Sequence, residues 1–287
     1  MKAKETGLCA LLLLGLFGCD ESMLRSTPET IPVPRVTQPY VAVFLSPASA
    51  TVEVLLTRIT PALGEGYEPD ALGLPKATIT LTRDDGQVLN VPNQSGIRHE
   101  VSHRGFVLAG RRYTLLVTTP DGNRLEGSCT VPVQNIDSQQ VRVTNLGDNR
   151  LRASWPDVTS QPDYYAVLNG SMLVNRRDTT FAAINSLFVL TDAVIAPNRR
   201  INSPVVNQAF DVPAGNPGIN YNSITICRTD SAYFAYHKSV ADIEAARQNP
   251  FAEPINLYSN VKGGYGIVAG YVGVRIVCKG ERIVQIR

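Results

Sequence analysis

The chain has 287 residues, of which 27 are Lys or Arg and 25 are Asp or Glu, so its formal net charge is +2. This balance gives no electrostatic reason to expect binding to nucleic acid or to an anionic surface. The length suffices for two domains with cores of their own, and no segment after the N-terminal apolar run approaches the roughly eighteen apolar residues of a membrane-spanning helix.

Residues 1–18 are predicted to be a signal peptide. Two lysines precede an apolar run that is too short to span a bilayer, and the run ends with Gly18 directly before Cys19. This order resembles the lipobox of bacterial lipoproteins. The resemblance implies cleavage before Cys19 and acylation of its thiol and its new amine, so that Cys19 becomes a lipid anchor. A plain secretory signal with a chance cysteine is the alternative.

Asp20 and Glu21 follow the cysteine directly. They resemble the export signal of surface lipoproteins in Bacteroidota, whereas an Asp at this place in enterobacteria suggests retention in the inner membrane. Residues 19–38 are polar and proline-rich, which is typical of a tether. Without residues 1–18 the chain keeps 25 basic and 24 acidic residues, a net charge of +1.

Residues 39–133 contain short segments in which apolar and polar residues alternate, separated by turn sequences such as Asp85-Gly86. Val52, Val54 and Leu56 share one face of such a segment. The pattern predicts an antiparallel β-sandwich of the immunoglobulin or fibronectin type III kind.

The letters HEVSH, from His99 to His103, match the H-E-x-x-H motif of zinc hydrolases. On a helix that motif places two imidazoles on one face, with Glu100 as general base. Here the neighbours favour strands, and a strand puts His99, Val101 and His103 on one face and Glu100 on the other. We therefore expect two histidines in a strand or loop and no metal site, with a zinc hydrolase as a remote alternative.

Residues 134–287 are predicted to form a second sandwich. Its opening, with Trp155 followed by Tyr164 and Tyr165, resembles a fibronectin type III domain. Residues 170–220 lack regular periodicity and indicate inserted loops that could bind a partner. A change to a spacing of three and four residues then predicts an amphipathic helix near 231–248.

Three cysteines remain if Cys9 leaves with the signal peptide and Cys19 is acylated. Cys227 and Cys278 could form a disulfide, or all three could be buried thiols. Gly264, Gly266 and Ala269 match the dinucleotide pattern G-x-G-x-x-A, but a strand-like sequence follows them in place of a helix. The glycines are expected to permit turns or close packing, and no cofactor is expected.

The C-terminal sequence resembles the signature of a family of Bacteroidota outer-membrane lipoproteins of unknown function, catalogued as domain of unknown function 4249. The middle of the chain supports the resemblance, with its Gly-x-x-Tyr strand and Pro-Asp-Gly turn. The chain departs from the family at Val268, where an aromatic residue is usual. The matching residues of the signature are Tyr233 to Val240, Asn249-Pro250-Phe251, Glu253-Pro254, Ser259-Asn260, Gly263-Gly264 and Gly266.

The resemblance implies a lipid-anchored outer-membrane protein, on the surface or periplasmic face, that is often encoded beside a TonB-dependent receptor. We therefore expect a non-enzymatic accessory or ligand-binding component in nutrient uptake, with such a receptor as partner. A structural or adhesion module without a transporter partner is the alternative. The loops of 170–220 and the segment 249–260 are the expected contact surfaces, although no individual ligand-binding residue is predicted.

Overall fold

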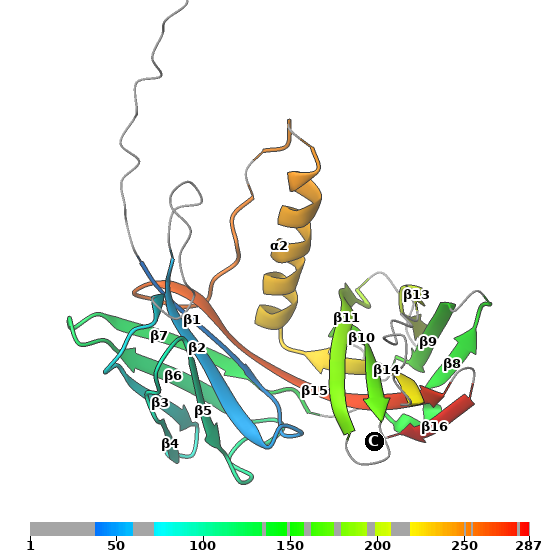
Figure 1. The fold of residues 1–287 in the computed structure, drawn as a ribbon, viewed down its shortest axis with the longest axis horizontal. Coiled ribbons are helices and arrows are strands. Elements are labelled where there is room, and N and C mark those ends of the chain that lie inside the picture. The colour runs from blue at the N-terminus through cyan, green and yellow to red at the C-terminus, as the bar shows by residue number, and fades with distance from the viewer. Residues whose placement is uncertain are drawn as a thin grey trace, which may run out of the picture. The chain divides into compact units, whose positions relative to one another are not determined.

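The structure is a computed structural model. It describes residues 38–59, 72–133, 136–147, 150–157, 162–174, 179–193, 199–207, 219–249, 251–253, 255–279 and 282–286. The described part is mainly β, with antiparallel sheets and one α-helix, as the sequence predicts (Figure 1). The predicted signal peptide, Cys19, Asp20, Glu21 and all of the tether except Gln38 lie outside these residues.

The first sandwich packs two groups of strands against each other. One is the sheet β4–β3–β6–β7, and the other is the β5–β2–β1 end of a larger sheet. The strand bounds are β1 Gln38–Leu45, β2 Thr51–Ile59, β3 Thr78–Arg83, β4 Val88–Val91, β5 Arg98–Ser102, β6 Arg112–Thr118 and β7 Arg124–Thr130. The predicted alternation is confirmed, because Val52, Val54 and Leu56 are at most 2% exposed. These side chains form part of one core with residues of β3, β6 and β7.

The second sandwich repeats this arrangement. A small sheet, in which β9 pairs with β8, β12 and β13, packs against β10, β14 and β15. Trp155 of β9 is 1% exposed and its ring centroid lies 5.4 Å from that of Tyr165, so the tryptophan lies in the core of this sandwich. The bounds are β8 Arg142–Asn145, β9 Arg150–Pro156, β10 Tyr164–Val174, β11 Thr179–Thr191, β12 Arg200–Asn202, β13 Val206–Asn207, β14 Ile219–Thr229, β15 Tyr265–Lys279 and β16 Arg282–Ile286.

One long strand, β15, belongs to both sandwiches. Its first residues pair in parallel with β1, from Tyr265 opposite Tyr40 to Gly270 opposite Leu45. Its remaining residues pair antiparallel with β14 and, near the C-terminus, with β16. The strands β5, β2 and β1 of the first sandwich and the strands β10, β14 and β15 of the second therefore belong to one eight-stranded sheet. The predicted domain boundary near residue 133 stays a prediction. Strand β15, which lies after that residue in the chain, nevertheless supplies Val268 and Val272 to the core of the first sandwich.

The helix α2, Ser231–Arg247, confirms the predicted helix at 231–248. The half-buried carboxylate of Asp230 caps it by accepting the Tyr233 N–H at 2.8 Å, and it also accepts the Gly270 N–H of β15 at 3.1 Å. Burial raises the pKa of this carboxyl to about 6. Asp230 therefore fixes the start of α2 to the strand that both sandwiches share.

The first half of α2 covers the face of the large sheet opposite the two sandwich cores. The strands present small side chains there, Ala42, Ala166 and Ala269, so that the helix can approach closely. Aromatic residues complete this third core. The Tyr40 and Tyr236 hydroxyls lie 2.9 Å apart, and Phe44 and Tyr233 contact His237. Burial among these rings lowers the pKa of His237 to about 4.

The prediction of irregular loops over 170–220 is wrong for much of that range. The last residues of β10 and all of β11 form a long hairpin in it, and β12, β13 and the start of β14 lie there too. The strand sequence TTFAAINSLFVLT is rich in β-branched and aromatic residues, which suit a strand even without strict alternation. Residues 175–178, 194–198 and 208–218 of this range lie outside the described part of the chain.

The pairing of β1 with β15 requires a glycine at position 266. The residue has a φ of +143°, and a Cβ built on it would lie 1.8 Å from the Val41 carbonyl oxygen. We predict that Gly266→Ala destabilises the protein by more than about 3 kcal/mol, because backbone strain and a clash with a neighbouring strand add together.

Urea denaturation of the mature chain measures this loss of stability. The matched control is Gly86→Ala, since Gly86 also has a positive φ of +87° but has open space around it. The control is expected to lose only about 1 kcal/mol. Equal losses in the two variants would contradict the role assigned to the close contact with β1.

Candidate functional site

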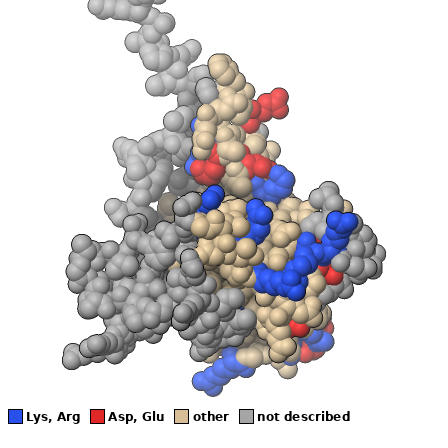
Figure 2. Space-filling model, turned by 90° about the vertical axis from the view of Figure 1, so that its right-hand side faces the viewer, with Lys and Arg blue, Asp and Glu red and all other residues tan. Residues whose placement is uncertain are grey.

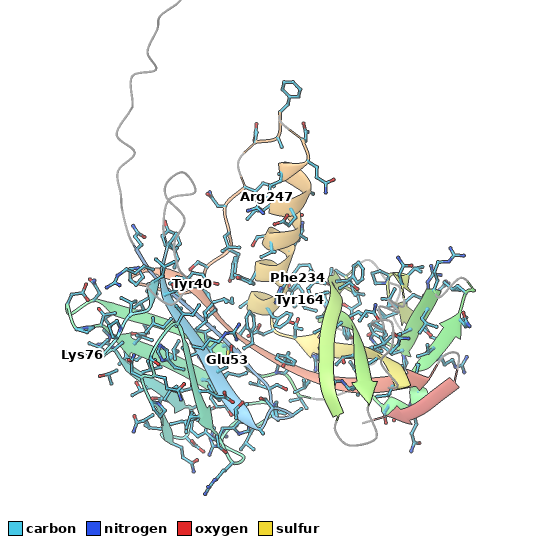
Figure 3. All side chains as sticks on the ribbon, viewed as in Figure 1. Tyr40, Glu53, Lys76, Tyr164, Phe234 and Arg247 are labelled. Carbon is cyan, nitrogen blue, oxygen red and sulfur yellow. The ribbon has the colours of Figure 1, made fainter. Side chains whose placement is uncertain are left out.

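The residues that follow α2 carry a concentration of exposed apolar side chains. We call residues 251–260 the post-helix segment; it lies directly beyond the end of α2, near which Figure 3 labels Arg247. Phe251 is 93% exposed, the largest value among the exposed large hydrophobic residues of the described chain. Ile255, Leu257 and Tyr258 are between 37% and 42% exposed. These exposed apolar side chains make the segment a candidate contact surface.

Hydrogen bonds hold the backbone of the post-helix segment at residues 251–252 and at Tyr258, although its large apolar side chains are exposed. The Asn249 side-chain oxygen accepts the Phe251 N–H at 3.0 Å, and the Asn249 carbonyl accepts the Ala252 N–H at 3.0 Å. Further along, the Tyr258 N–H donates to the hydroxyl of Ser239 on α2 at 3.0 Å. A surface fixed in this way loses little conformational entropy when it binds a partner.

Ser259 and Asn260 fasten the end of the segment to the strands. The Asn260 side-chain amide donates to the carbonyls of Val268 and Ser128, at 2.8 and 3.2 Å, while its oxygen accepts the Val268 N–H at 2.9 Å. We call these three hydrogen bonds of Asn260 the asparagine clamp. The Ser259 hydroxyl accepts the N–H groups of Val261 and Gly266. These contacts join the segment to β7 and β15. They explain why the sequence signature places Ser-Asn shortly before a run of glycines.

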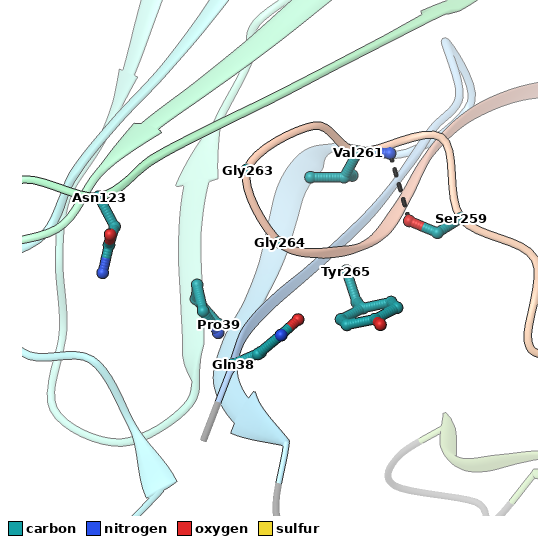
Figure 4. A pocket seen from close by; sticks show the side chains of 8 residues that line it. All are labelled: Gln38, Pro39, Asn123, Ser259, Val261, Gly263, Gly264 and Tyr265. Atoms are coloured by element: carbon teal, nitrogen blue, oxygen red, sulfur yellow. Dashed lines mark hydrogen bonds between the residues drawn. The ribbon is translucent and has the colours of Figure 1, made fainter. Parts of the chain in front are cut away.

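A pocket of about 640 Å³ adjoins the end of the post-helix segment (Figure 4). It lies where β1 and β15 begin, and the ring of Tyr265, which is 46% exposed, borders it. The sequence analysis did not predict it, because its walls come from separate parts of the chain. Its lining residues are Gln38, Pro39, Asn123, Ser259, Val261, Gly263, Gly264 and Tyr265.

The histidines of HEVSH lie in and just after β5, as the sequence predicts, and not on a helix. Glu100 is exposed, whereas His99 is fully buried and accepts the Gln94 N–H on Nδ1 at 2.9 Å. His103 accepts the Gly105 N–H on Nδ1, so its Nε2–H donates to the Ser49 carbonyl. Three of the four ring nitrogens therefore have backbone partners. Among the described residues no three His, Cys, Asp or Glu side chains are grouped to hold a metal ion.

The glycine pattern and the two cysteines Cys227 and Cys278 also have structural roles. Gly264 lies just before β15, and Gly266 and Ala269 lie within this strand, which confirms close sheet packing for these residues. The suggested disulfide is wrong, because Cys227 and Cys278 are free thiols on opposite faces of the large sheet. Burial raises the pKa of Cys227 to about 12, so this thiol is unreactive. No helix in the described ranges is long and apolar enough to cross a membrane.

Comparisons with known proteins bear mainly on the family. A family model described as a domain of unknown function (DUF4249) matches residues 30–275, which confirms the resemblance to this domain family. No curated protein matches the chain.

Solved structures with similar features include a cytokine receptor complex, with 12% identity, a TM-score of 0.24, and coverage of 65% of this chain and 89% of the other. Another is a segment of two fibronectin type III domains from chicken tenascin, with 15% identity, a TM-score of 0.19, and coverage of 67% and 90%. A third is the FN1–FN3 part of chicken CNTN1, with 12% identity, a TM-score of 0.24, and coverage of 66% and 57%. The scores are too low to carry an argument about function.

The contacts of Asn260 predict a sharp effect of a small substitution. Asn260→Asp replaces an amide donor by a carboxylate that would face the Ser128 and Val268 carbonyls. We expect it to destabilise the protein by about 2–4 kcal/mol and to speed amide exchange at Val268. Thermal unfolding and hydrogen–deuterium exchange measure the two effects.

Asn249→Asp is the matched control for this variant. Asn249 uses its side-chain oxygen as an acceptor for Phe251, and a carboxylate retains that function. The control should change stability by less than about 0.5 kcal/mol. A control as damaging as Asn260→Asp would show that the asparagine clamp is not what holds the segment.

Proposed function

The chain belongs to the DUF4249 family, and from that premise we propose that it is a non-enzymatic accessory lipoprotein of the outer membrane. In this proposal Cys19 carries the lipid anchor, and the post-helix segment binds a TonB-dependent receptor that works in nutrient uptake. The observation that carries the proposal is the exposure of Phe251 on a segment whose backbone is fixed.

A protein partner suits the post-helix segment better than a small ligand does. Its exposed side chains project from a chain that follows the free end of a helix, and they do not line an enclosed cavity. Large apolar and aromatic side chains are the residues that carry most of the free energy of protein–protein binding. Phe251 would enter a pocket of the partner, with Ile255 and Leu257 covering the surface around it.

The tether that follows the proposed lipid anchor is long enough to allow this contact. Residues 19–37 lie between Cys19 and the start of β1 and, when extended, reach about 60 Å. Such a tether would let the sandwiches stand clear of the membrane beside a large receptor. Asp20 and Glu21 would act as the export signal that decides between the surface and the periplasmic face.

A spacer or adhesion module is the second candidate, and the shared strand β15 favours it. A strand that runs through both sandwiches makes their connection stiffer than a flexible linker would. In that case the protein would have no transporter partner.

The lipid anchor predicts a change of location in one variant. Cys19→Ala should move the protein from the membrane fraction to the soluble fraction, since no acyl chain would hold it. Fractionation of cells, with immunoblotting of both fractions, measures the change. Cys9→Ala, which alters a cysteine inside the predicted signal peptide, is the control and should stay in the membrane. Cys19→Ala protein that remains in the membrane would refute the anchor.

The partner surface predicts a loss of copurification. Phe251→Asp should reduce recovery of a TonB-dependent receptor with the detergent-solubilised protein by at least about tenfold, since burying a carboxylate in an apolar contact is costly. Mass spectrometry of the purified complex measures the recovery. Val88→Asp is the control, because Val88 is 55% exposed on β4 of the first sandwich. If no receptor copurifies with the unaltered protein, the result would favour the spacer function.

A further inference from the structure

A group of arginines covers the outer face of the small sheet in the second sandwich. Along β9, Leu151, Ala153 and Trp155 point into the core, so Arg150, Arg152 and Ser154 point outward. The register extends this outer face to the neighbouring strands. Arg142 of β8 lies opposite Ser154, Thr144 lies opposite Arg152, and Arg200 and Asn202 of β12 lie on the same side. We call these side chains the arginine face.

Two arginines of this face, Arg142 and Arg152, carry positive charge that no acidic side chain among the described residues pairs with. Arg142 and Arg152 are exposed, and neither has an ion pair within the part of the chain that the structure describes. The outward positions of β8, β9, β12 and β13 include no Asp or Glu. Figure 2 shows Lys and Arg, with some Asp and Glu beside them, on the side of the molecule where β8 and β9 lie in Figure 1.

One guanidinium of this face is fixed in position. Arg200 donates to the Ser154 carbonyl at 2.6 Å, to the Ser154 hydroxyl at 3.2 Å and to the Gln140 carbonyl at 2.8 Å. Burial and the nearby charge of Arg142 lower the pKa of Arg200. Like charges held this close raise the free energy of the unbound protein, and a bound anion would lower it.

The shape of the face selects an extended ligand. Outward residues on one strand repeat about every 7 Å, and neighbouring strands lie about 4.8 Å apart, so the guanidinium groups form a flat array. The pocket described above is lined by residues of other strands. A flat array of separate positive groups suits a polymer with repeated negative charges better than one small anion.

The side chains that lie between the arginines indicate which kind of polyanion the face can bind. The face has no aromatic side chain on which nucleic-acid bases could stack, and no large apolar side chain that could enter a bilayer. It has Thr144 and Asn202 instead, whose hydroxyl and amide groups can bond to sugar hydroxyls. Arginine pairs with carboxylates through two parallel hydrogen bonds.

We propose that the arginine face binds an acidic polysaccharide whose sugars carry carboxylate groups. This surface is separate from the post-helix segment, so the inference does not depend on the proposed receptor partner. The nearly neutral net charge of the sequence gives no sign of the arginine face. The face forms only because strand pairing brings together arginines up to 58 positions apart, from Arg142 to Arg200.

The test uses the mature chain and polygalacturonate as the probe, with affinity electrophoresis and titration calorimetry as measurements. We expect binding that weakens as salt rises from about 50 to 200 mM. The double variant Arg142→Gln/Arg152→Gln should raise the Kd at least about tenfold. Both side chains are exposed, so the thermal midpoint should stay unchanged.

The matched control removes two positive charges elsewhere. Arg98→Gln/Arg124→Gln alters exposed arginines of the first sandwich, which pair with Glu53 and Glu126. It should change the Kd less than about twofold. Three results would overturn the proposal: no binding to polygalacturonate, equal weakening by both double variants, or equally tight binding of an oligonucleotide or of anionic vesicles through the same arginines.

Discussion

The parallel pairing of β1 with the first half of β15 is the interaction on which the rest of the structure depends. It places a strand from near the C-terminus beside the first described strand, and it joins two sandwiches into one sheet. The contact requires Gly266, since any side chain there would meet the backbone of Val41. The other half of β15 carries the second sandwich through β14. The two cores therefore share one strand.

The same strand also positions the helix and the surface beyond it. Asp230 binds both α2 and Gly270, while Asn260 returns the chain from the post-helix segment to Val268. The segment is thus held at both ends by β15 or by the helix attached to it. This arrangement lets Phe251 stand in solvent on a rigid support, which is what a binding surface needs and a core does not.

The local features were predictable from sequence, because they depend on neighbouring residues. Alternation around Val52 and Val54 gives strands, and Asp230 before a three-and-four spacing gives the capped helix. That the segment 249–260 is a contact surface stays a prediction. What the sequence could not provide was pairing between distant strands. The role of β15 in both sandwiches, the asparagine clamp and the arginine face all arise from contacts between residues far apart in the chain. Cys227 and Cys278 show the same limit, since only the sheet register places them on opposite faces.

The distance along the chain between β1 and β15 has a consequence for how the protein is made. Val41 and Gly266 are separated by 225 positions, so β1 cannot pair with β15 until residue 266 and those around it have left the ribosome. Contacts of such long range slow folding, because a large loop must close before they form. Until then one edge of β1 is open to pairing with other chains. The first sandwich therefore stays incompletely folded until late in synthesis, and its open strand edge is exposed to aggregation unless chaperones protect it.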